Sequence, residues 1–183
     1  MKYWPVPKSY SKNIPNNNSP GSFWENRGDR HHCGVDIYAP LGSDVIAVEN
    51  GEVFDVGLFT SPLLLPHWNT TYYILIKNIT GYICKYAELR DVNINVADQI
   101  NSGQLIGHVG QVLKRQSITQ ESPAYIKELL KKNNLSMLHF ELFKASPIRS
   151  NDYLGGNWYG SKKPRYLLNP TSYLLSILRS PCK

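Results

Sequence analysis

The sequence predicts a mainly β protein with one domain, built on an antiparallel sheet or a β-sandwich-like arrangement. Segments 72–77 and 82–89 are rich in β-branched and aromatic residues and flank a short Gly-containing segment, 78–81, which is typical of a hairpin. Residues 137–142 alternate between two kinds of side chain with the two-residue period of a strand that has one apolar face. A length of 183 residues is enough to bury a core without disulfides.

The N-terminal 27 residues predict an extended arm, and residues 28–183 the domain itself. Segment 9–21 is rich in Ser, Asn and Pro and has no apolar periodicity that would mark a strand or a helix.

Segment 45–56 predicts a further hairpin. Residues 45–48 and 52–56 are strand-like and flank Asn50-Gly51, a strong short-range signal for a two-residue β-turn.

Two helices are expected. Pro123 followed by residues 124–130 predicts a short inserted helix with proline in its first turn. Residues 171–178, which follow Asn169-Pro170, predict a C-terminal helix.

Two segments far apart in the sequence carry candidate zinc ligands: His32 and Asp36 in HCGVD, and His139 in LHFEL. Positions four apart in a straight strand are roughly 13 Å apart, so the first two ligands need a bend, which Gly34 allows. Two nitrogens and one carboxylate leave a fourth position open on zinc, as in catalytic rather than structural sites.

The order of HCGVD, VIAVENGEV, KYAEL, GQLIGHVG and LHFEL resembles that of the lysostaphin-like (LytM-type, β-lytic) zinc metallopeptidases, over residues 28–142. This resemblance implies a LytM-type domain that binds one zinc ion through His32, Asp36 and His139. It implies a peptide or a peptidoglycan fragment as the substrate. Segments 59–71 and 111–136 are then insertions, and the second is expected to border the cleft because it leads directly into the ligand strand.

The chain departs from the family pattern at the two histidines that assist catalysis without binding zinc. Met137 and Glu88 stand in their places. Methionine cannot transfer a proton, whereas glutamate serves as the general base in other zinc hydrolases. Glu88 is therefore the candidate base, and His108 is a further catalytic candidate that could compensate.

Three side chains are expected beside the ligands or in the cleft: Met137, Tyr86 and Glu141. Glu141 is expected either to orient His139 or to face solvent at the rim.

Two interpretations stay open. The protein is an enzyme that uses Glu88 as a substitute base, which we favour, or it is a catalytically inactive zinc-containing module that binds a peptide or cell-wall fragment or serves in regulation. Loss of general acid–base help typically costs ~10²–10⁴-fold in rate per group, so the difference is large.

Charge and termini bear on partners and compartment. The net charge is +6, but the basic run 162–165 is short and has no accompanying nucleic-acid-binding motif, so no such partner is expected. No apolar stretch long enough for a membrane span or a secretory signal is present. A cytoplasmic protein is therefore expected, or a periplasmic or extracellular one if the chain is a trimmed form.

Overall fold

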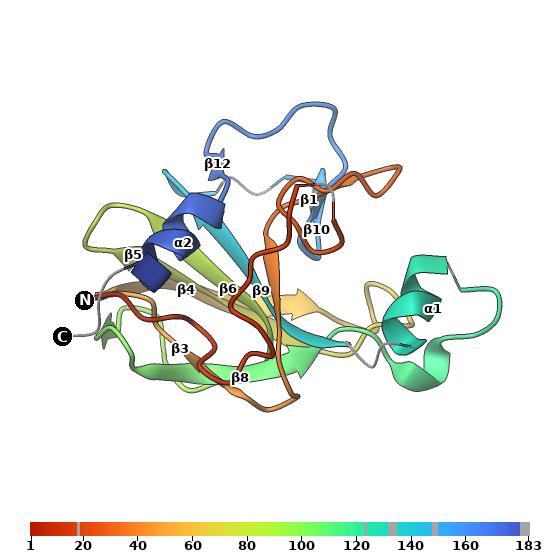
Figure 1. Cartoon of the computed structure of the whole chain (residues 1–183), viewed down its shortest axis with the longest axis horizontal. Helices are drawn as coiled ribbons and strands as arrows, with labels where there is room; N and C mark the ends of the chain where they lie inside the picture. The colour runs from red at the N-terminus through yellow and green to blue at the C-terminus, as the bar shows by residue number, and fades with distance from the viewer. Residues whose placement is uncertain (18, 123, 132–134, 148–149, 180–183) are drawn as a thin grey trace.

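The computed structural model describes residues 1–17, 19–122, 124–131, 135–147 and 150–179, and the predicted mainly β architecture is confirmed (Figure 1). The strands are β1 His31–His32, β2 Val35–Tyr38, β3 Asp44–Ile46, β4 Gly51–Thr60, β5 Thr71–Asn78, β6 Ile83–Val92, β7 Gln99–Ile100, β8 Leu105–Gln111, β9 Ser136–Phe143, β10 Tyr153–Leu154, β11 Asn157–Trp158 and β12 Leu167–Leu168. The helices are the 3₁₀ turn η1 Arg115–Ser117, α1 Ala124–Lys131 and α2 Thr171–Arg179.

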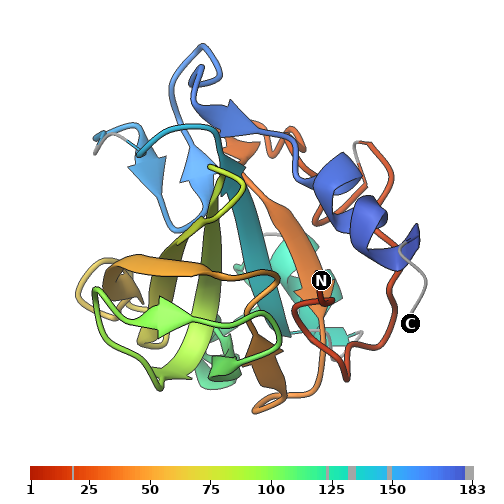
Figure 2. The same cartoon turned by 90° about the vertical axis from the view of Figure 1, so that its left-hand side faces the viewer.

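The larger sheet has the order β12–β9–β8–β6–β5–β4–β7, with β2 paired to β9 and β3 to β8. All of its pairings are antiparallel, and the sheet is strongly curled (Figure 2). A smaller sheet, β1–β11–β10, lies above one end of it in Figure 1. The sequence did not predict this second sheet, because its strands are only two residues long and show no periodicity.

The predicted hairpin across Asn50-Gly51 is wrong. Strand β3 pairs with β8, with Val45 opposite Gly107, whereas β4 pairs with β5 and β7. The backbone between β3 and β4 bonds elsewhere, since Ala47 N–H donates to Gln104 O at 2.9 Å. Tertiary pairing thus overrides the local turn signal.

The other strand predictions agree with the structure. Strands β5 and β6 form the expected antiparallel hairpin. Strand β9 places Leu138 and Phe140, both fully buried, in the main core, so that His139 and Glu141 point to its opposite face.

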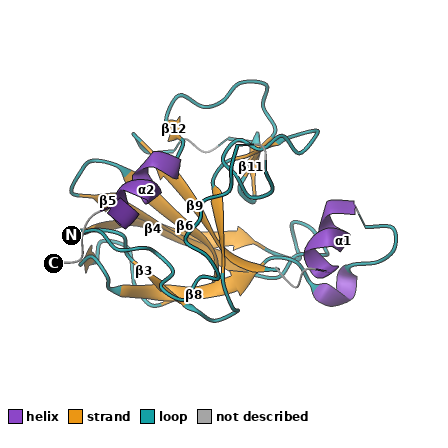
Figure 3. Cartoon of the chain, in the orientation of Figure 1, coloured by secondary structure: helices purple, strands orange, loops and turns teal. Residues whose placement is uncertain are grey.

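The two helices occupy different positions. Helix α2 packs Tyr173, Leu174 and Ile177 into the main core, and the Asn169 side chain caps its first turn by accepting from Thr171 N–H at 2.9 Å. Helix α1 covers the predicted residues 124–130 and stands beyond the end of the large sheet (Figures 1 and 3). Pro123 lies outside the described residues. None of the helices in the described part of the chain is long and apolar enough to span a membrane.

The N-terminal segment contributes to the core. Trp4 and Val6 are buried in the main hydrophobic cluster, and Ile14 packs against it. Backbone bonds tie this segment to the sheet: Tyr3 N–H donates to Val48 O, and Asp36 N–H donates to Gly21 O. These residues therefore help to hold the strand that carries Asp36.

The segments 59–71 and 111–136 lie side by side. Trp68 and Leu113 form an isolated β-bridge, and Asn69 N–H donates to Val112 O at 2.6 Å. The described parts of the two segments, called the rim below, thus meet beyond the ends of β5 and β8.

The buried position of Trp4 leads to a prediction for stability. We expect Trp4→Ala to lower the free energy of unfolding by about 3–5 kcal/mol, because a large core side chain is removed. Urea denaturation measures this change. Tyr10→Ala, in the same segment but 59% exposed, is the control and should change stability by less than about 0.5 kcal/mol. Equal small effects of both substitutions would mean that the segment is dispensable to the core.

Candidate metal centre

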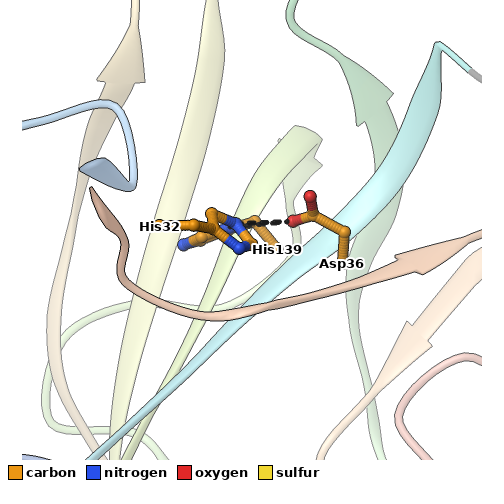
Figure 4. A group of neighbouring side chains, drawn as sticks. All are labelled: His32, Asp36 and His139. Atoms are coloured by element: carbon orange, nitrogen blue, oxygen red, sulfur yellow. Dashed lines mark hydrogen bonds and ion pairs between the residues drawn. The ribbon is translucent and has the colours of Figure 1, made fainter. Parts of the chain in front are cut away.

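Three buried side chains, His32, Asp36 and His139, meet at one point (Figure 4). Asp36 on β2 lies directly opposite His139 on β9 in the antiparallel register, which fixes the distance between these two residues. His32 ends β1, and the chain is redirected between β1 and β2 at Gly34. The predicted bend is present, and the structure brings the three predicted ligands together.

Two glycines make room for the imidazole of His139. A Cβ atom at Gly34 would lie 2.9 Å from the ring and 2.5 Å from Phe140 O, and one at Gly156 would lie 2.7 Å from the ring. A glycine is therefore needed at position 34, because the backbone there lies close to Phe140 O and to the ring of His139. Phe59 stacks on the same ring, with the centroids 5.7 Å apart, so the imidazole is held from several sides.

The outer nitrogen of each imidazole has a partner that fixes its tautomer. His32 Nδ1 donates to Ser22 O at 2.8 Å, and His139 Nε2 donates to Glu141 Oε1 at 2.8 Å. With these protons placed outside, His32 Nε2 and His139 Nδ1 present lone pairs to the centre of the cluster.

The inner atoms form a nearly equilateral triangle. His32 Nε2 is 3.0 Å from His139 Nδ1 and 3.1 Å from Asp36 Oδ1, and His139 Nδ1 is 3.0 Å from the same oxygen. Ligand atoms of a tetrahedral zinc ion with bonds of about 2.0–2.1 Å are separated by roughly 3.3 Å. The donor set and its spacing therefore fit a single zinc ion. Such an ion would replace the proton that His139 binds in the metal-free protein: burial acts to lower the pKa of His139, but the hydrogen bonds with Asp36 and Glu141 raise it to about 9.

The second oxygen of Asp36 is held by Arg27, a residue that the sequence did not indicate. Arg27 Nη2 lies 3.6 Å from Asp36 Oδ2, Nε donates to Glu25 at 3.0 Å, and Nη1 donates to Asn157 Oδ1 at 3.1 Å. The guanidinium thereby forms an ion pair with Asp36 through Oδ2, whereas Oδ1 faces the two histidines. No local pattern marks Arg27, because a turn before β1 brings it to Asp36.

Glu88 lies in a β-bulge of strand β6 and lines the cleft beside the centre. Ala87 pairs with Tyr73 and Leu89 with Tyr72, so Glu88 is the extra residue of the strand, and its φ is 63°. This left-handed conformation is strained for a glutamate and is typical of bulges that aim a side chain at a site.

The carboxyl group of Glu88 is poorly compensated. It lines the cleft beside Asp36, and its Oε2 is buried without a hydrogen-bond partner among the described residues. Burial raises the pKa of Glu88 to about 8; the Asp36 carboxylate adds to this rise, and His139 and Arg27 oppose it.

A cleft of about 960 Å³ opens beside Asp36 and Glu88. Met137 lines it, as do Glu25, Arg27 and Asn157. The rim described above supplies most of the apolar lining, namely Leu65, Trp68, Val112, Leu113, Ile118, Ile126, Leu129 and Leu135. The segment 111–136 therefore borders the cleft.

Glu141 lies behind His139 and away from solvent. It is fully buried, and its Oε1 accepts from both His139 and the Tyr153 hydroxyl. Burial acts to raise its pKa, but Lys85 together with the hydrogen bonds from His139 and Tyr153 lowers the pKa of Glu141 to about 2. Of the two expected positions, Glu141 therefore takes the one beside His139 and does not face solvent.

Two other candidates lie apart from the cluster. Tyr86 is fully buried in the main core, where its ring packs on Phe140 and its hydroxyl accepts from Val48 N–H at 2.9 Å. His108 Nδ1 bonds Asp91 at 2.6 Å, and neither residue lines the cleft. The bulge separates Tyr86 from Glu88, because it breaks the alternation that would have placed both on one face.

Comparisons with known proteins agree with this architecture. The sequence model of peptidase family M23 matches residues 30–149. The antimicrobial peptidase lysostaphin from Staphylococcus simulans superposes with a TM-score of 0.57 at 19% identity, over 100% of this chain and 58% of that chain. An NMR solution structure of lysostaphin gives a TM-score of 0.54 at 18% identity, over 97% of this chain and 56% of that one.

At these identities the structural likeness shows the fold alone. This chain also spans little more than half the length of the two lysostaphin chains. No curated protein sequence matches it.

The raised pKa of Glu88 predicts a pH-dependent effect on stability in the chelator-treated protein. Between about pH 4.5 and 8 the carboxyl ionises in the unfolded chain but stays protonated when folded, so rising pH favours unfolding. Glu88→Gln removes this effect and should gain stability relative to the wild type across that range, by at most about 1.4 kcal/mol per pKa unit.

Urea denaturation at several pH values measures this difference. Glu52→Gln, at an exposed position of β4, controls for the loss of one carboxylate. A constant difference between Glu88→Gln and the wild type over the whole range would contradict the prediction.

Proposed function

The chain belongs to peptidase family M23, and from this premise we propose that it holds one zinc ion at His32, Asp36 and His139 and hydrolyses a peptide bond. The substrate would be a peptide or a peptidoglycan fragment that enters the adjacent cleft. The observation that carries the proposal is the convergence of His32 Nε2, His139 Nδ1 and Asp36 Oδ1 at separations of 3.0–3.1 Å, each on a side chain with a partner on its outer side.

Each side chain around the centre would have a separate role. Zinc, when bound, would supply a Lewis acid beside the cleft, since Asp36 is part of the cleft lining. Asp36, whose Oδ2 forms an ion pair with Arg27, would keep its Oδ1 in position as a ligand during turnover. His32 and His139 would bind the metal as neutral imidazoles through Nε2 and Nδ1, because the protons of their other ring nitrogens are donated to Ser22 O and Glu141.

Glu88 would act as the general base. It would take a proton from the attacking water and return it to the leaving amine, in the way that glutamate serves in other zinc hydrolases. Its aim into the cleft, its uncompensated Oε2 and its pKa of about 8 support this role, since an effective base titrates near the working pH.

One observation favours a second function. Met137 lines the cleft where the family pattern has a histidine, and a thioether neither transfers a proton nor donates a hydrogen bond to a developing oxyanion. If Glu88 alone is not sufficient, the same cleft would hold a peptide without cutting it, and the protein would be a zinc-containing binding or regulatory module.

The first test concerns the metal. The purified wild type should contain stoichiometric zinc by elemental analysis, and His32→Ala, Asp36→Ala and His139→Ala should each lose most of it because a ligand is removed. Circular dichroism controls for folding. Full zinc content in all three variants would exclude this site.

The second test concerns the base. We expect Glu88→Gln to retain zinc but to lower hydrolysis of a peptidoglycan and peptide panel by about 10²–10⁴-fold, because the proton acceptor is lost. Glu128→Gln, which alters another carboxylate of the cleft wall, is the matched control and should remain active. Chelator-sensitive cleavage that survives in Glu88→Gln would contradict the assignment, and a wild type that binds zinc and peptide without cleavage would support the binding module.

A further inference from the structure

Lys85 is a buried cation placed behind the metal centre. It lies on β6 opposite Glu141 of β9, and two residues further along the same strands Ala87 lies opposite His139. Because alternate residues share a face, Lys85, Glu141 and His139 lie on one side of the sheet. Lys85 is only 7% exposed and does not line the cleft, so it has no route to the substrate.

Its ammonium group is enclosed by aromatic rings from three strands. Nζ lies 5.1 Å from the ring of Phe59 on β4, 5.0 Å from that of Tyr73 on β5 and 4.3 Å from that of Tyr153 on β10. Cation–π contacts of this kind stabilise an ammonium group that has lost its water.

A chain of short polar contacts leads from this ammonium to the centre. Lys85 Nζ donates to the Tyr153 hydroxyl at 2.6 Å, and that hydroxyl donates to Glu141 Oε1 at 2.5 Å. The same oxygen accepts from His139 Nε2 at 2.8 Å and lies 3.9 Å from Lys85 Nζ.

We propose that Lys85 and Tyr153 are positioning residues for the metal ligand His139, which they fix through the carboxylate of Glu141. This inference rests on the proposed function, since it assigns a role in holding the same zinc ion.

The geometry supports this role in two ways. Glu141 Oε1 must accept from His139 Nε2 if His139 Nδ1 is to face the centre, and the Tyr153 hydroxyl, which donates to the same oxygen, helps to fix the position of that oxygen. The charge of Lys85 also compensates a carboxylate that is fully buried and whose Oε2 has no hydrogen-bond partner in the described part of the chain.

Tyr153 belongs to the small sheet, and the other contacts come from the large one. The contacts of Tyr153 with Lys85 and Glu141 therefore join the two sheets behind the metal centre. An intact β1–β11–β10 sheet is then a condition for correct placement of His139, although His139 itself lies on β9.

The experiment measures zinc affinity by competition with a chromogenic chelator at fixed pH. We expect Lys85→Met and Tyr153→Phe each to weaken zinc binding by about 10- to 100-fold, as is typical when the partner behind a ligand is removed. The visible spectrum of the cobalt-substituted protein should change in both variants, because it reports ligand geometry.

Matched controls make the same chemical changes elsewhere. Lys77→Met alters an exposed lysine of β5, and Tyr73→Phe removes a hydroxyl that bonds Asp55 while keeping the ring beside Lys85. Both should bind zinc as the wild type does.

A double-mutant cycle separates positioning from a purely structural role. If Lys85 acts through Glu141, Lys85→Met should cause no further loss of zinc affinity in a Glu141→Gln background. An equal loss in that background would overturn the inference, as would a Lys85→Met protein that is less stable but binds zinc normally. If Lys85→Met does not fold, the same cycle with Tyr153→Phe decides the question.

The proposed function and this inference can fail separately. A wild type that binds no zinc would overturn both. Normal zinc binding by the wild type together with unchanged affinity in Tyr153→Phe and Lys85→Met would overturn the inference alone.

Discussion

The antiparallel register between β2 and β9 is the constraint on which the rest of the site depends. It places Asp36 directly opposite His139, and the chain before β2 then has only a short distance in which to return His32 to the same point. Gly34 permits that return, because a side chain there would collide with Phe140 O and with the ring of His139. A slip of one residue would turn His139 and Glu141 into the apolar core and bring Leu138 and Phe140 out, so the buried face protects the register.

Each of the three candidate ligands has a partner of its own on the side away from the centre. Ser22 holds His32, Arg27 holds Asp36, and Glu141 holds His139. The first two supports come from the N-terminal segment and the third from β9, with Tyr153 of the small sheet behind it. The N-terminal segment has few regular elements of its own, yet it supplies the partners of His32 Nδ1 and of Asp36 Oδ2.

The two carboxyl groups Glu88 and Glu141 lie in different electrostatic environments. Glu88 adopts a left-handed backbone conformation in a bulge, and burial acts on a carboxyl group that has the Asp36 carboxylate near it. Glu141, two residues from His139 on the same strand, has Lys85 and His139 beside it. The two carboxyl groups consequently have pKa values that lie far apart, about 8 and about 2.

The sequence by itself determined the elements with clear periodicity and the candidate ligands. The alternation in β9, the hairpin of β5 and β6, helix α2 and the trio His32, Asp36 and His139 all follow from local patterns or motif spacing. Tertiary structure decided which strands pair, and it therefore replaced the hairpin expected at Asn50-Gly51 by pairing of β3 with β8.

Tertiary structure also decided the aim of Glu88 and the burial of Glu141, as well as the partners Arg27, Lys85 and Tyr153. A period of two identifies the faces of a strand but carries no information about which distant segment will cover a face, nor about where an extra residue will interrupt it. The contacts that the tertiary structure decided join residues as far apart in the sequence as Lys85 and Tyr153, and only the folded chain brings these residues within hydrogen-bonding distance.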